Sequence, residues 1–178
     1  LKILDIGSGL SPLPAYLQKK GHQVTAVDDN SWKLWKNESW MKKIYNTDVN
    51  YIIIEDISSL NQFKKNTFDL IISCSVIEHF DDQTFNQFIP TMYKILKPEG
   101  CIVLTFDLNI PIFQKNKNSS ESIYPEKALE MIEMLLKDDP SSLLDIYKKK
   151  LTSLIWQIKY NYPLLIFSKI LSNFIHLF

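Results

Sequence analysis

Short apolar runs, most of them followed by glycine or acidic residues, recur along the first 106 residues of this chain. Five of them stand out, at residues 1–6, 23–27, 51–54, 68–73 and 101–106. Apolar runs of about four to eight residues bounded by turn residues are typical of strands buried on both faces of a parallel sheet. Because the stretches between the runs contain helices or have room for them, we predict an α/β fold with a doubly wound, mainly parallel sheet and helices on both faces.

Three segments between these strands carry helix signals. The first begins near Ser11, a predicted N-cap that is followed by a proline, and stops at Gly21. The second covers residues 31–45 and carries three of the four tryptophans, which indicate core packing, with a partner surface as the alternative. The third covers residues 82–96 and ends at the turn of residues 97–100.

The pattern becomes less regular after residue 106. Residues 125–137 predict a helix, so we expect one domain over residues 1–137. Residues 138–178 are expected to form an apolar, helical C-terminal extension of the same domain. Its stretch at 151–178 falls short of a membrane span, and three roles remain open: covering the sheet edge, a homodimer contact, or peripheral contact with a membrane.

Length, composition and charge narrow the class of protein and its partners. With 178 residues, 46% of them hydrophobic, the chain can bury one α/β core and is too short for two ordinary domains. The 20 Lys and Arg residues equal the 20 Asp and Glu residues, so no net field favours nucleic acid. Cys74 and Cys101 are expected at buried strand ends, without a disulfide framework or metal-ligand spacing. We therefore expect no metal, a cytoplasmic location and, since Leu1 already lies in a strand, a fragment of a longer protein.

Polar residues gather where the predicted strands end, and doubly wound sheets bind their ligands outside those carboxyl ends. The first strand runs into Asp-Ile-Gly-Ser-Gly at residues 5–9, where glycines let the backbone approach a ligand and the next helix start offers N–H groups to a carboxylate. Asp28 follows the second strand, where a carboxylate can accept hydrogen bonds from both ribose hydroxyls of a nucleoside. NAD sites also use a carboxylate to bind ribose hydroxyls, so these residues alone also fit an enzyme that binds a dinucleotide.

The run at residues 4–9 resembles the first motif of class I S-adenosylmethionine-dependent methyltransferases, an acidic residue two before Gly-x-Gly at the end of the first strand. That resemblance implies a Rossmann-like fold and places the methionine end of the cofactor at the glycines, with Asp5 facing its amino group. Leu10, Ser11 and Pro12 stand where many members of the family continue the glycine pattern. The turn is therefore expected to hold the methionine end through a capped helix start.

Acidic residues at the next two strand ends favour this cofactor over NAD. The resemblance gives Asp28 the ribose role, while Asp29 beside it either joins the site or caps the next helix. Asp56 stands where the family has an acidic residue near the adenine amino group, with Ile57 supplying a backbone N–H or an apolar contact. Each acid alone could be an ordinary turn residue, but dinucleotide enzymes do not require the third one.

The fourth strand leads into residues 74–79, Cys-Ser-Val-Ile-Glu-His, which resemble the fourth motif of small-molecule methyltransferases with a Val-x-Glu-His turn. The Asn/Asp-Pro-Pro-Tyr/Phe signature of enzymes that methylate adenine and amide nitrogens is absent from this strand end. For a hydroxyl acceptor His79 is the candidate general base, because imidazole takes up protons near neutral pH, and Glu78 is the alternative. Both residues could instead only brace the next helix. With the Leu-Lys-Pro-Glu-Gly turn at residues 96–100, the resemblance spans residues 1–106.

The resemblance implies a methyltransferase that moves a methyl group from S-adenosyl-L-methionine to a small or lipid-like acceptor, at oxygen rather than at carbon or nitrogen. The residues implied to contact the cofactor are Asp5, Gly7, Ser8, Gly9, Asp28, Asp29, Asp56, Ile57, Cys74 and Ser75. One alternative is an NAD-dependent oxidoreductase, which leaves Asp5, Asp56 and the Glu-His turn unexplained. The other is a non-catalytic Rossmann-like binding domain.

Overall fold

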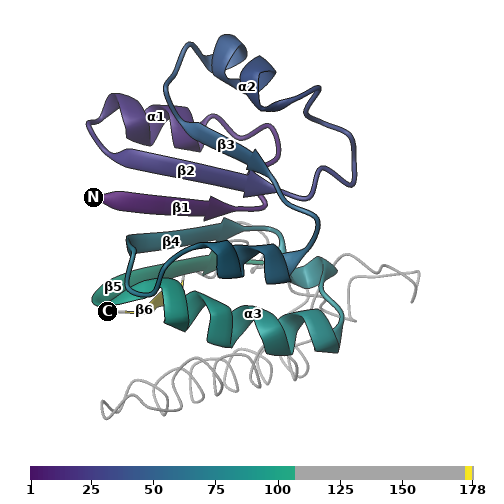
Figure 1. Cartoon of the computed structure of the whole chain (residues 1–178), viewed down its shortest axis with the longest axis vertical. Coiled ribbons are helices and arrows are strands. Elements are labelled where there is room, and N and C mark those ends of the chain that lie inside the picture. The colour runs from purple at the N-terminus through teal and green to yellow at the C-terminus, as the bar shows by residue number, and fades with distance from the viewer. Residues whose placement is uncertain (107–174, 178) are drawn as a thin grey trace, which may run out of the picture. The chain divides into compact units, whose positions relative to one another are not determined.

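The computed structural model describes residues 1–106 and 175–177 of the chain (Figure 1). The elements in chain order are β1 (Lys2–Ile6), α1 (Leu13–Lys19), β2 (Gln23–Asp28), α2 (Glu38–Tyr45), β3 (Asn50–Ile53), the 3-10 helix η1 (Ile57–Gln62), β4 (Phe68–Cys74), the 3-10 helix η2 (Ile77–His79), α3 (Asp82–Ile95), β5 (Leu96–Thr105) and β6 (Ile175–Leu177). Residues 1–105 form one compact unit that also includes β6. Each of the apolar runs that predicted a strand forms one.

The strands form one sheet in the order β3-β2-β1-β4-β5-β6. The first five run parallel, and β6 pairs antiparallel with β5, with Ile102 opposite Leu177 and Leu104 opposite Ile175. The order reverses at β1, whose neighbours are β2 and β4. The crevice above the carboxyl ends of β1 and β4 is therefore the topological switch point, where sheets of this kind bind their ligands. The predicted α/β class, with a doubly wound and mainly parallel sheet, is confirmed.

Apolar side chains cover both faces of this sheet. The buried residues of one cluster, which packs with α1 and α2, are Ile3, Val24, Ala26, Trp35, Met41, Val49, Tyr51 and Ile72. Side chains alternate between the faces of a strand, so Leu4 and Ile71, both fully buried, lie on the opposite face. Figure 1 shows α1 and α2 beside β2 and β3, and α3 beside β4 and β5. The helices thus cover the faces of the sheet. Because the five strands are parallel, their carboxyl ends lie together at one edge.

The helix expected over residues 31–45 forms only in its second half, as α2. Asn30 adopts a left-handed conformation (φ 54°), and its side chain bonds the backbone of Trp35 twice, accepting from N at 2.8 Å and donating to O at 2.9 Å. Asn37 then starts the helix by accepting a hydrogen bond from Trp40 N at 2.8 Å. Such local side-chain bonds compete with helical pairing, which is why the prediction was wrong for the first turns.

Strand β5 begins at Leu96 rather than at Cys101. The predicted turn at residues 97–100 lies inside β5 as an irregularity in its register with β4, where a bulge absorbs the extra residues. The predicted burial of the two cysteines was wrong, because Cys74 is exposed and Cys101 is half-buried. Cys74 is the last residue of β4, at the open edge of the sheet where the loops begin.

Residues 175–177, expected to be helical, form the strand β6. An unpaired edge of β5 would leave backbone N–H and C=O groups without partners, and β6 supplies those partners along part of it. The helix predicted at 125–137, the domain boundary after residue 137 and the rest of the apolar extension lie outside the described residues. No helix in the described part of the chain combines the length and the apolar composition that crossing a bilayer requires.

Candidate functional site

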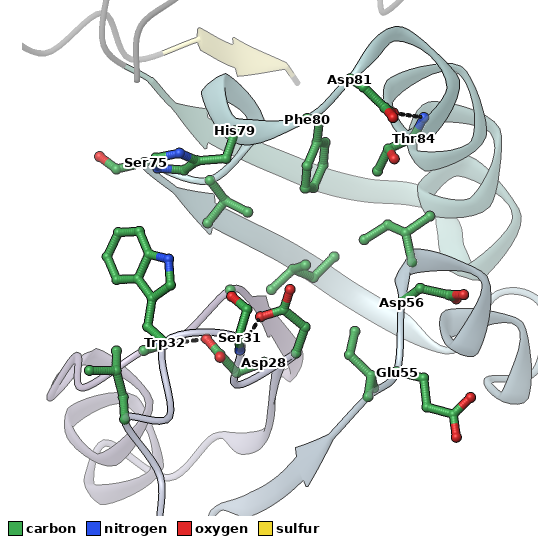
Figure 2. A pocket seen from close by; sticks show the side chains of 18 residues that line it. Asp28, Ser31, Trp32, Glu55, Asp56, Ser75, His79, Phe80, Asp81 and Thr84 are labelled. Carbon is green, nitrogen blue, oxygen red and sulfur yellow. Dashed lines mark hydrogen bonds between the residues drawn. The ribbon is translucent and has the colours of Figure 1, made fainter. Parts of the chain in front are cut away.

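A cavity of about 500 Å³ opens at the carboxyl ends of β1, β2, β3 and β4 (Figure 2). Its walls come from the loops after β1 and β2, the turn from β3 into η1, and the segment that leads from β4 to the first turn of α3. Cavities of about 300–1,000 Å³ are typical of small-molecule and cofactor sites. The cavity therefore lies at the switch point of the sheet and has the size of a ligand site.

Most residues predicted for the site line this cavity. They are Gly7, Gly9, Asp28, Asp29, Asp56, Ile57, Ser75 and His79. Four predicted residues do not line it: Asp5, Ser8 and Glu78 are buried, and Cys74 is exposed but not part of the wall. Parallel strands end at one edge of a sheet, which is why residues from four separate loops meet.

We call the turn after β1, residues Gly7–Leu10, the glycine loop. Gly7 and Gly9 have φ angles of 69° and 48°, in the left-handed region that residues with side chains rarely adopt. A Cβ atom on Gly7 would collide with the side chain of Val76, whereas on Gly9 it would meet only Leu34 Cδ1, at 3.8 Å. Glycine is therefore required by packing and conformation at the first position and by conformation alone at the second.

The start of the glycine loop is bonded to the sheet. The backbone N–H groups of Gly7 and Ser8 both donate to Val27 O, at 2.9 and 3.1 Å. These two donors are therefore engaged by β2 rather than directed to a ligand. After the loop, α1 begins at Leu13 with Pro12 as its N-cap, so the predicted N-cap Ser11 lies one residue too early, although its Oγ accepts a hydrogen bond from Leu13 N at 3.2 Å.

Asp28, the last residue of β2, ties the glycine loop to the next loop of the chain. Its Oδ2 accepts from Gly9 N at 2.8 Å, and its Oδ1 accepts from Asn30 N at 2.7 Å. A carboxylate oxygen can accept a second hydrogen bond. The side chain thus shapes the cavity wall and keeps acceptor capacity on both oxygens for hydroxyls of a ligand.

Two aromatic residues of the segment predicted as the second helix, Trp35 and Tyr45, also hold the glycine loop. Trp35 Nε1 donates to Gly9 O at 2.6 Å, and the Tyr45 hydroxyl donates to Leu10 O. Trp35 is buried with its ring edge-to-face on Tyr51, at a centroid distance of 5.4 Å. The bonded partners are 26 and 35 positions apart in the chain, so no local pattern signals them.

Asp5 lies behind the cavity wall. It is 3% exposed and stands opposite Ala26 of β2, on the face that packs with α1 and α2, while the next residue, Ile6, lines the cavity. Burial raises the pKa of Asp5 to about 7, an effect that Ser8 partly offsets and the charge of Asp28 reinforces. The predicted direct contact of Asp5 with the amino end of the cofactor finds no support in this geometry, because side chains alternate along β1.

Glu78 and Cys74 lie near Asp5. Burial raises the pKa of the Cys74 thiol, Thr105 lowers it, and the charges of Asp5 and Glu78 raise it further. Glu78 is 7% exposed and absent from the cavity wall, whereas its neighbour His79 lines the cavity. Adjacent residues of a 3-10 turn point in different directions, so only one of the two predicted bases reaches the cavity.

Asp56 follows β3 and caps η1. Its Oδ1 accepts from Ser58 N at 2.8 Å, from Ser58 Oγ at 2.6 Å and from Ser59 N at 3.3 Å. These hydrogen bonds, led by the Ser58 hydroxyl, hold the pKa of Asp56 below its usual value. With Glu55 and Ile57 it forms the wall of the cavity at the end of β3. All three of these hydrogen bonds end on one oxygen, so Asp56 combines a capping role with a place in the wall.

The side chains of His79 and Trp32 lie close to each other in the cavity wall (Figure 2). Their ring centroids are 5.7 Å apart with an interplanar angle of 78°, an edge-to-face arrangement that is favourable for aromatic pairs. Trp32 is 69% exposed and belongs to the loop after β2. The sequence interpretation placed it in a core helix, but the shortened α2 leaves it on the wall, where it orients the imidazole.

The segment after β4 supplies wall residues that the sequence interpretation missed. It starts at Ser75, a non-glycine residue with φ 53° whose N–H donates to Thr105 O at 2.9 Å. Left-handed residues of this kind cluster at functional sites. Phe80, Asp81 and Thr84 complete the wall, and Asp81 caps α3 by accepting from Thr84 N at 2.7 Å (Figure 2). The capping pair can be read in the sequence, but its place beside the cavity depends on the fold.

Acidic residues dominate the charge of the cavity wall. They are Asp28, Asp29, Glu55, Asp56 and Asp81, and none of the described lining residues is Lys or Arg. A cleft lined by one sign of charge attracts ligands of the opposite sign. The wall therefore suits a ligand with a net positive charge, such as S-adenosylmethionine, whose sulfonium and ammonium groups outnumber its one carboxylate.

Known proteins with similar sequences are methyltransferases. A family model described as a methyltransferase domain matches residues 4–104. Phosphoethanolamine N-methyltransferase of Plasmodium falciparum is 34% identical over 106 residues, which cover 58% of this chain and 38% of that protein. Ubiquinone biosynthesis O-methyltransferase of Rickettsia typhi is 28% identical over 107 residues, which cover 59% of this chain and 40% of that protein. The chain thus spans about two fifths of the length of these curated relatives.

Solved structures of methyltransferases share the fold. An S-adenosylmethionine-dependent methyltransferase from Methanosarcina mazei is 20% identical, with a TM-score of 0.58 over 77% of each chain. The 1,6-didemethyltoxoflavin-N1-methyltransferase of Burkholderia thailandensis, solved with S-adenosylhomocysteine, is 17% identical, with a TM-score of 0.56 over 75% of this chain and 59% of that one. Because the family model covers more than half of the 178 residues and the sheet agrees with it, this chain belongs to the class I S-adenosylmethionine-dependent methyltransferase family.

Proposed function

We propose that this chain transfers a methyl group from S-adenosylmethionine to a hydroxyl oxygen of a small or lipid-like acceptor. The observation that carries the proposal is that Gly9, Asp28 and His79, which lie at or after the carboxyl ends of three different strands, line one cavity. Figure 2 shows Asp28 and His79 on opposite sides of it. A donor held on the Asp28 side leaves the His79 side for an acceptor.

The donor half of the proposal uses the loops after β1, β2 and β3. The glycine loop carries the methionine end, and Asp28 accepts hydrogen bonds from the ribose hydroxyls with the lone pairs that Gly9 and Asn30 leave free. Asp56 and Ile57 border the adenine. Asp29 lines the cavity and accepts from Ser31 N at 2.9 Å within the loop after β2, while Asn37 and not Asp29 caps the next helix, α2.

The acceptor half centres on His79. When bound, S-adenosylmethionine supplies a methyl group on a sulfonium, which is a good leaving group. The acceptor oxygen forms a bond to the methyl carbon, the bond between that carbon and sulfur breaks, and His79 takes the hydroxyl proton. The displacement is in line, so alignment and exclusion of water by the cavity supply much of the rate. Glu78, buried behind the wall, is a positioning neighbour rather than the base.

The relatives support a small-molecule acceptor, and their names differ in the acceptor atom. One is a phosphoethanolamine N-methyltransferase and the other an O-methyltransferase of ubiquinone biosynthesis. We favour oxygen because a hydroxyl must lose its proton as it attacks, and the presence of His79 in the cavity wall supports a base that takes up that proton. The alternative of an NAD-dependent oxidoreductase has no relative among these proteins.

Calorimetric titration tests the cofactor. The chain is titrated in parallel with S-adenosylhomocysteine and with NADH, under the same buffer and salt. We expect binding of S-adenosylhomocysteine and none of NADH, because an acid at the third strand end suits the methyl donor. Binding of NADH alone would overturn the proposal.

Methyl transfer is tested with matched acceptors. The chain is incubated with methyl-labelled S-adenosylmethionine and pairs of small molecules that share a skeleton and differ in carrying a hydroxyl or an amine. We expect label in the hydroxyl member of a pair. Label only in amines would replace oxygen by nitrogen in the proposal. Label in neither, with the cofactor bound, would point to a non-catalytic binding domain.

We further propose that the protein is cytoplasmic and that residues 151–178 form a homodimer contact or a peripheral contact with a membrane. Apart from 175–177, those residues lie outside the described part of the chain. Sedimentation of the full chain tests the dimer, and flotation with anionic vesicles tests the membrane contact. A monomer that stays with the soluble fraction would contradict both.

A further inference from the structure

The glycine loop is held by a separate segment of the chain. Residues 10–12 carry no glycine to continue the motif, and the loop instead receives hydrogen bonds from residues Asn30–Tyr45, which we call the bracing segment. This segment runs from the end of β2 through α2. It includes the loop that the sequence interpretation took for helix.

The bracing segment bonds two successive carbonyl groups of the loop. Trp35 Nε1 donates to Gly9 O at 2.6 Å, and the Tyr45 hydroxyl donates to Leu10 O. The position of Trp35 is itself set by Asn30, whose side chain bonds both the N–H and the C=O of Trp35, at 2.8 and 2.9 Å. Trp35 is 2% exposed, so its indole donor has no competition from water.

Gly9 is the residue of the loop that most needs such support. Its φ of 48° lies in the left-handed region. A Cβ atom added to Gly9 would have Leu34 Cδ1 as its nearest neighbour, at 3.8 Å. A glycine without packing neighbours visits several conformations. Here its N–H is bonded to Asp28 at 2.8 Å and its C=O to Trp35, so the peptide planes on both sides are oriented.

We propose that Trp35 and Tyr45 are positioning residues for the methionine end of the methyl donor and act through the glycine loop. The inference rests on the proposed function, in which this loop carries the methionine end. Neither residue lines the cavity, so neither touches the donor itself. Their effect is confined to the part of the ligand over the loop, while the adenosine part depends on other residues of the wall.

Two ligands that differ only at that end test the proposal. S-adenosylhomocysteine carries the amino acid, and 5′-methylthioadenosine lacks it. Trp35→Phe removes the indole donor and keeps an aromatic ring against Tyr51. We expect calorimetry to show S-adenosylhomocysteine binding weakened about tenfold, as for loss of one buried hydrogen bond, and methylthioadenosine binding changed by less than about twofold.

Two further variants complete the experiment. Tyr45→Phe removes only the hydroxyl that bonds Leu10, and we expect it to weaken S-adenosylhomocysteine about threefold with methylthioadenosine unchanged. Trp40→Phe is the matched control for Trp35→Phe. Trp40 belongs to the same bracing segment and packs on the same apolar cluster, but its ring faces Lys36 Nζ at 5.9 Å. This variant is expected to leave the affinity for both ligands unchanged.

Equal weakening of both ligands by Trp35→Phe would assign that residue to general packing and overturn the proposal, as would unchanged binding of both. If Trp35→Phe fails to fold, the split between ligands in Tyr45→Phe decides. Failure of the proposed function gives a different result, because the wild-type chain would then bind neither ligand. If the wild-type chain binds both ligands and the variants change the two affinities equally, only this inference is overturned and the proposed function stands.

Discussion

The two halves of the cavity are built in different ways. The donor half is held by hydrogen bonds to its backbone, with the N–H of Gly9 bonded to Asp28 and its C=O to Trp35. The acceptor half, residues 75–84, has backbone hydrogen bonds of its own, such as that from Ser75 N to Thr105 O, but the ring of His79 is in contact with the ring of an exposed tryptophan. Hydrogen bonds restrict orientation more narrowly than ring contacts do.

This difference teaches how one fold can combine a common donor with varied acceptors. A donor shared by a whole family needs one fixed binding loop, whereas acceptors differ in shape and are contacted by side chains, such as His79, whose ring contacts restrict them less. We therefore expect substitutions in the donor half to change cofactor affinity or folding. Substitutions in the acceptor half should change turnover instead.

The largest effect is expected from His79→Ala in the acceptor half. Loss of a general base should lower turnover about a thousandfold, while the dissociation constant of S-adenosylhomocysteine stays within about twofold. Turnover is measured with labelled donor and affinity by calorimetry, with His79→Gln as a variant that keeps a polar side chain. A matching loss of affinity would show that the two halves are not separate, and unchanged turnover would return His79 to a structural role.

Gly7→Ala should be the most damaging change to the folding of the donor half. The added methyl group collides with the side chain of Val76 at a φ of 69°, so we expect the free energy of unfolding to fall by about 3 kcal/mol. Urea unfolding measures it. Gly9→Ala, whose added methyl group meets only Leu34 Cδ1 at 3.8 Å, should lower it by only about 1 kcal/mol, and Val76→Ala should partly rescue Gly7→Ala. Equal losses in the two glycine variants would contradict the collision.

Asp28→Ala should weaken S-adenosylhomocysteine about 30-fold. The change removes the acceptor proposed for the ribose and the bonds to Gly9 N and Asn30 N, which are charge-assisted. Calorimetry measures the affinity. Asp29→Ala is the matched control, because the Asp29 carboxylate accepts from Ser31 N rather than from the glycine loop, and it should change the affinity by about twofold or less. Similar losses in both variants would count against the ribose role.

The smallest effect concerns Asp5, behind the donor half. Its pKa is raised from 3.8 to about 7, so between these pH values the folded protein holds a proton that the unfolded chain has released. The free energy of unfolding therefore falls as the pH rises through this range and levels off above about 7. Asp5→Asn lacks this fall, and from pH 6 to 8 its stability should rise by about 1–2 kcal/mol relative to the wild type. A pH-independent difference in urea unfolding would contradict the raised pKa.

Most of the fold could be predicted because its signals are local. Apolar runs followed by turn residues predicted the five parallel strands, and their order along the chain predicted where ligand-binding loops would meet. The helix over residues 31–45 was predicted too long, because three tryptophans gave helical spacing while Asn30 and Asn37 determined the backbone through their side chains. The spacing of apolar residues does not show where asparagine side chains bond the backbone and so prevent a helix from forming.

The sequence by itself determined which residues stand at the strand ends, and with them Gly9, Asp28 and His79 of the cavity wall. Only the tertiary structure decided that Asp5 lies behind that wall and that Trp35 reaches Gly9 from 26 positions away. Residues that follow a strand are carried to the sheet edge by chain order alone. The direction of a buried side chain and a bond between distant segments depend instead on how the whole sheet packs against its helices.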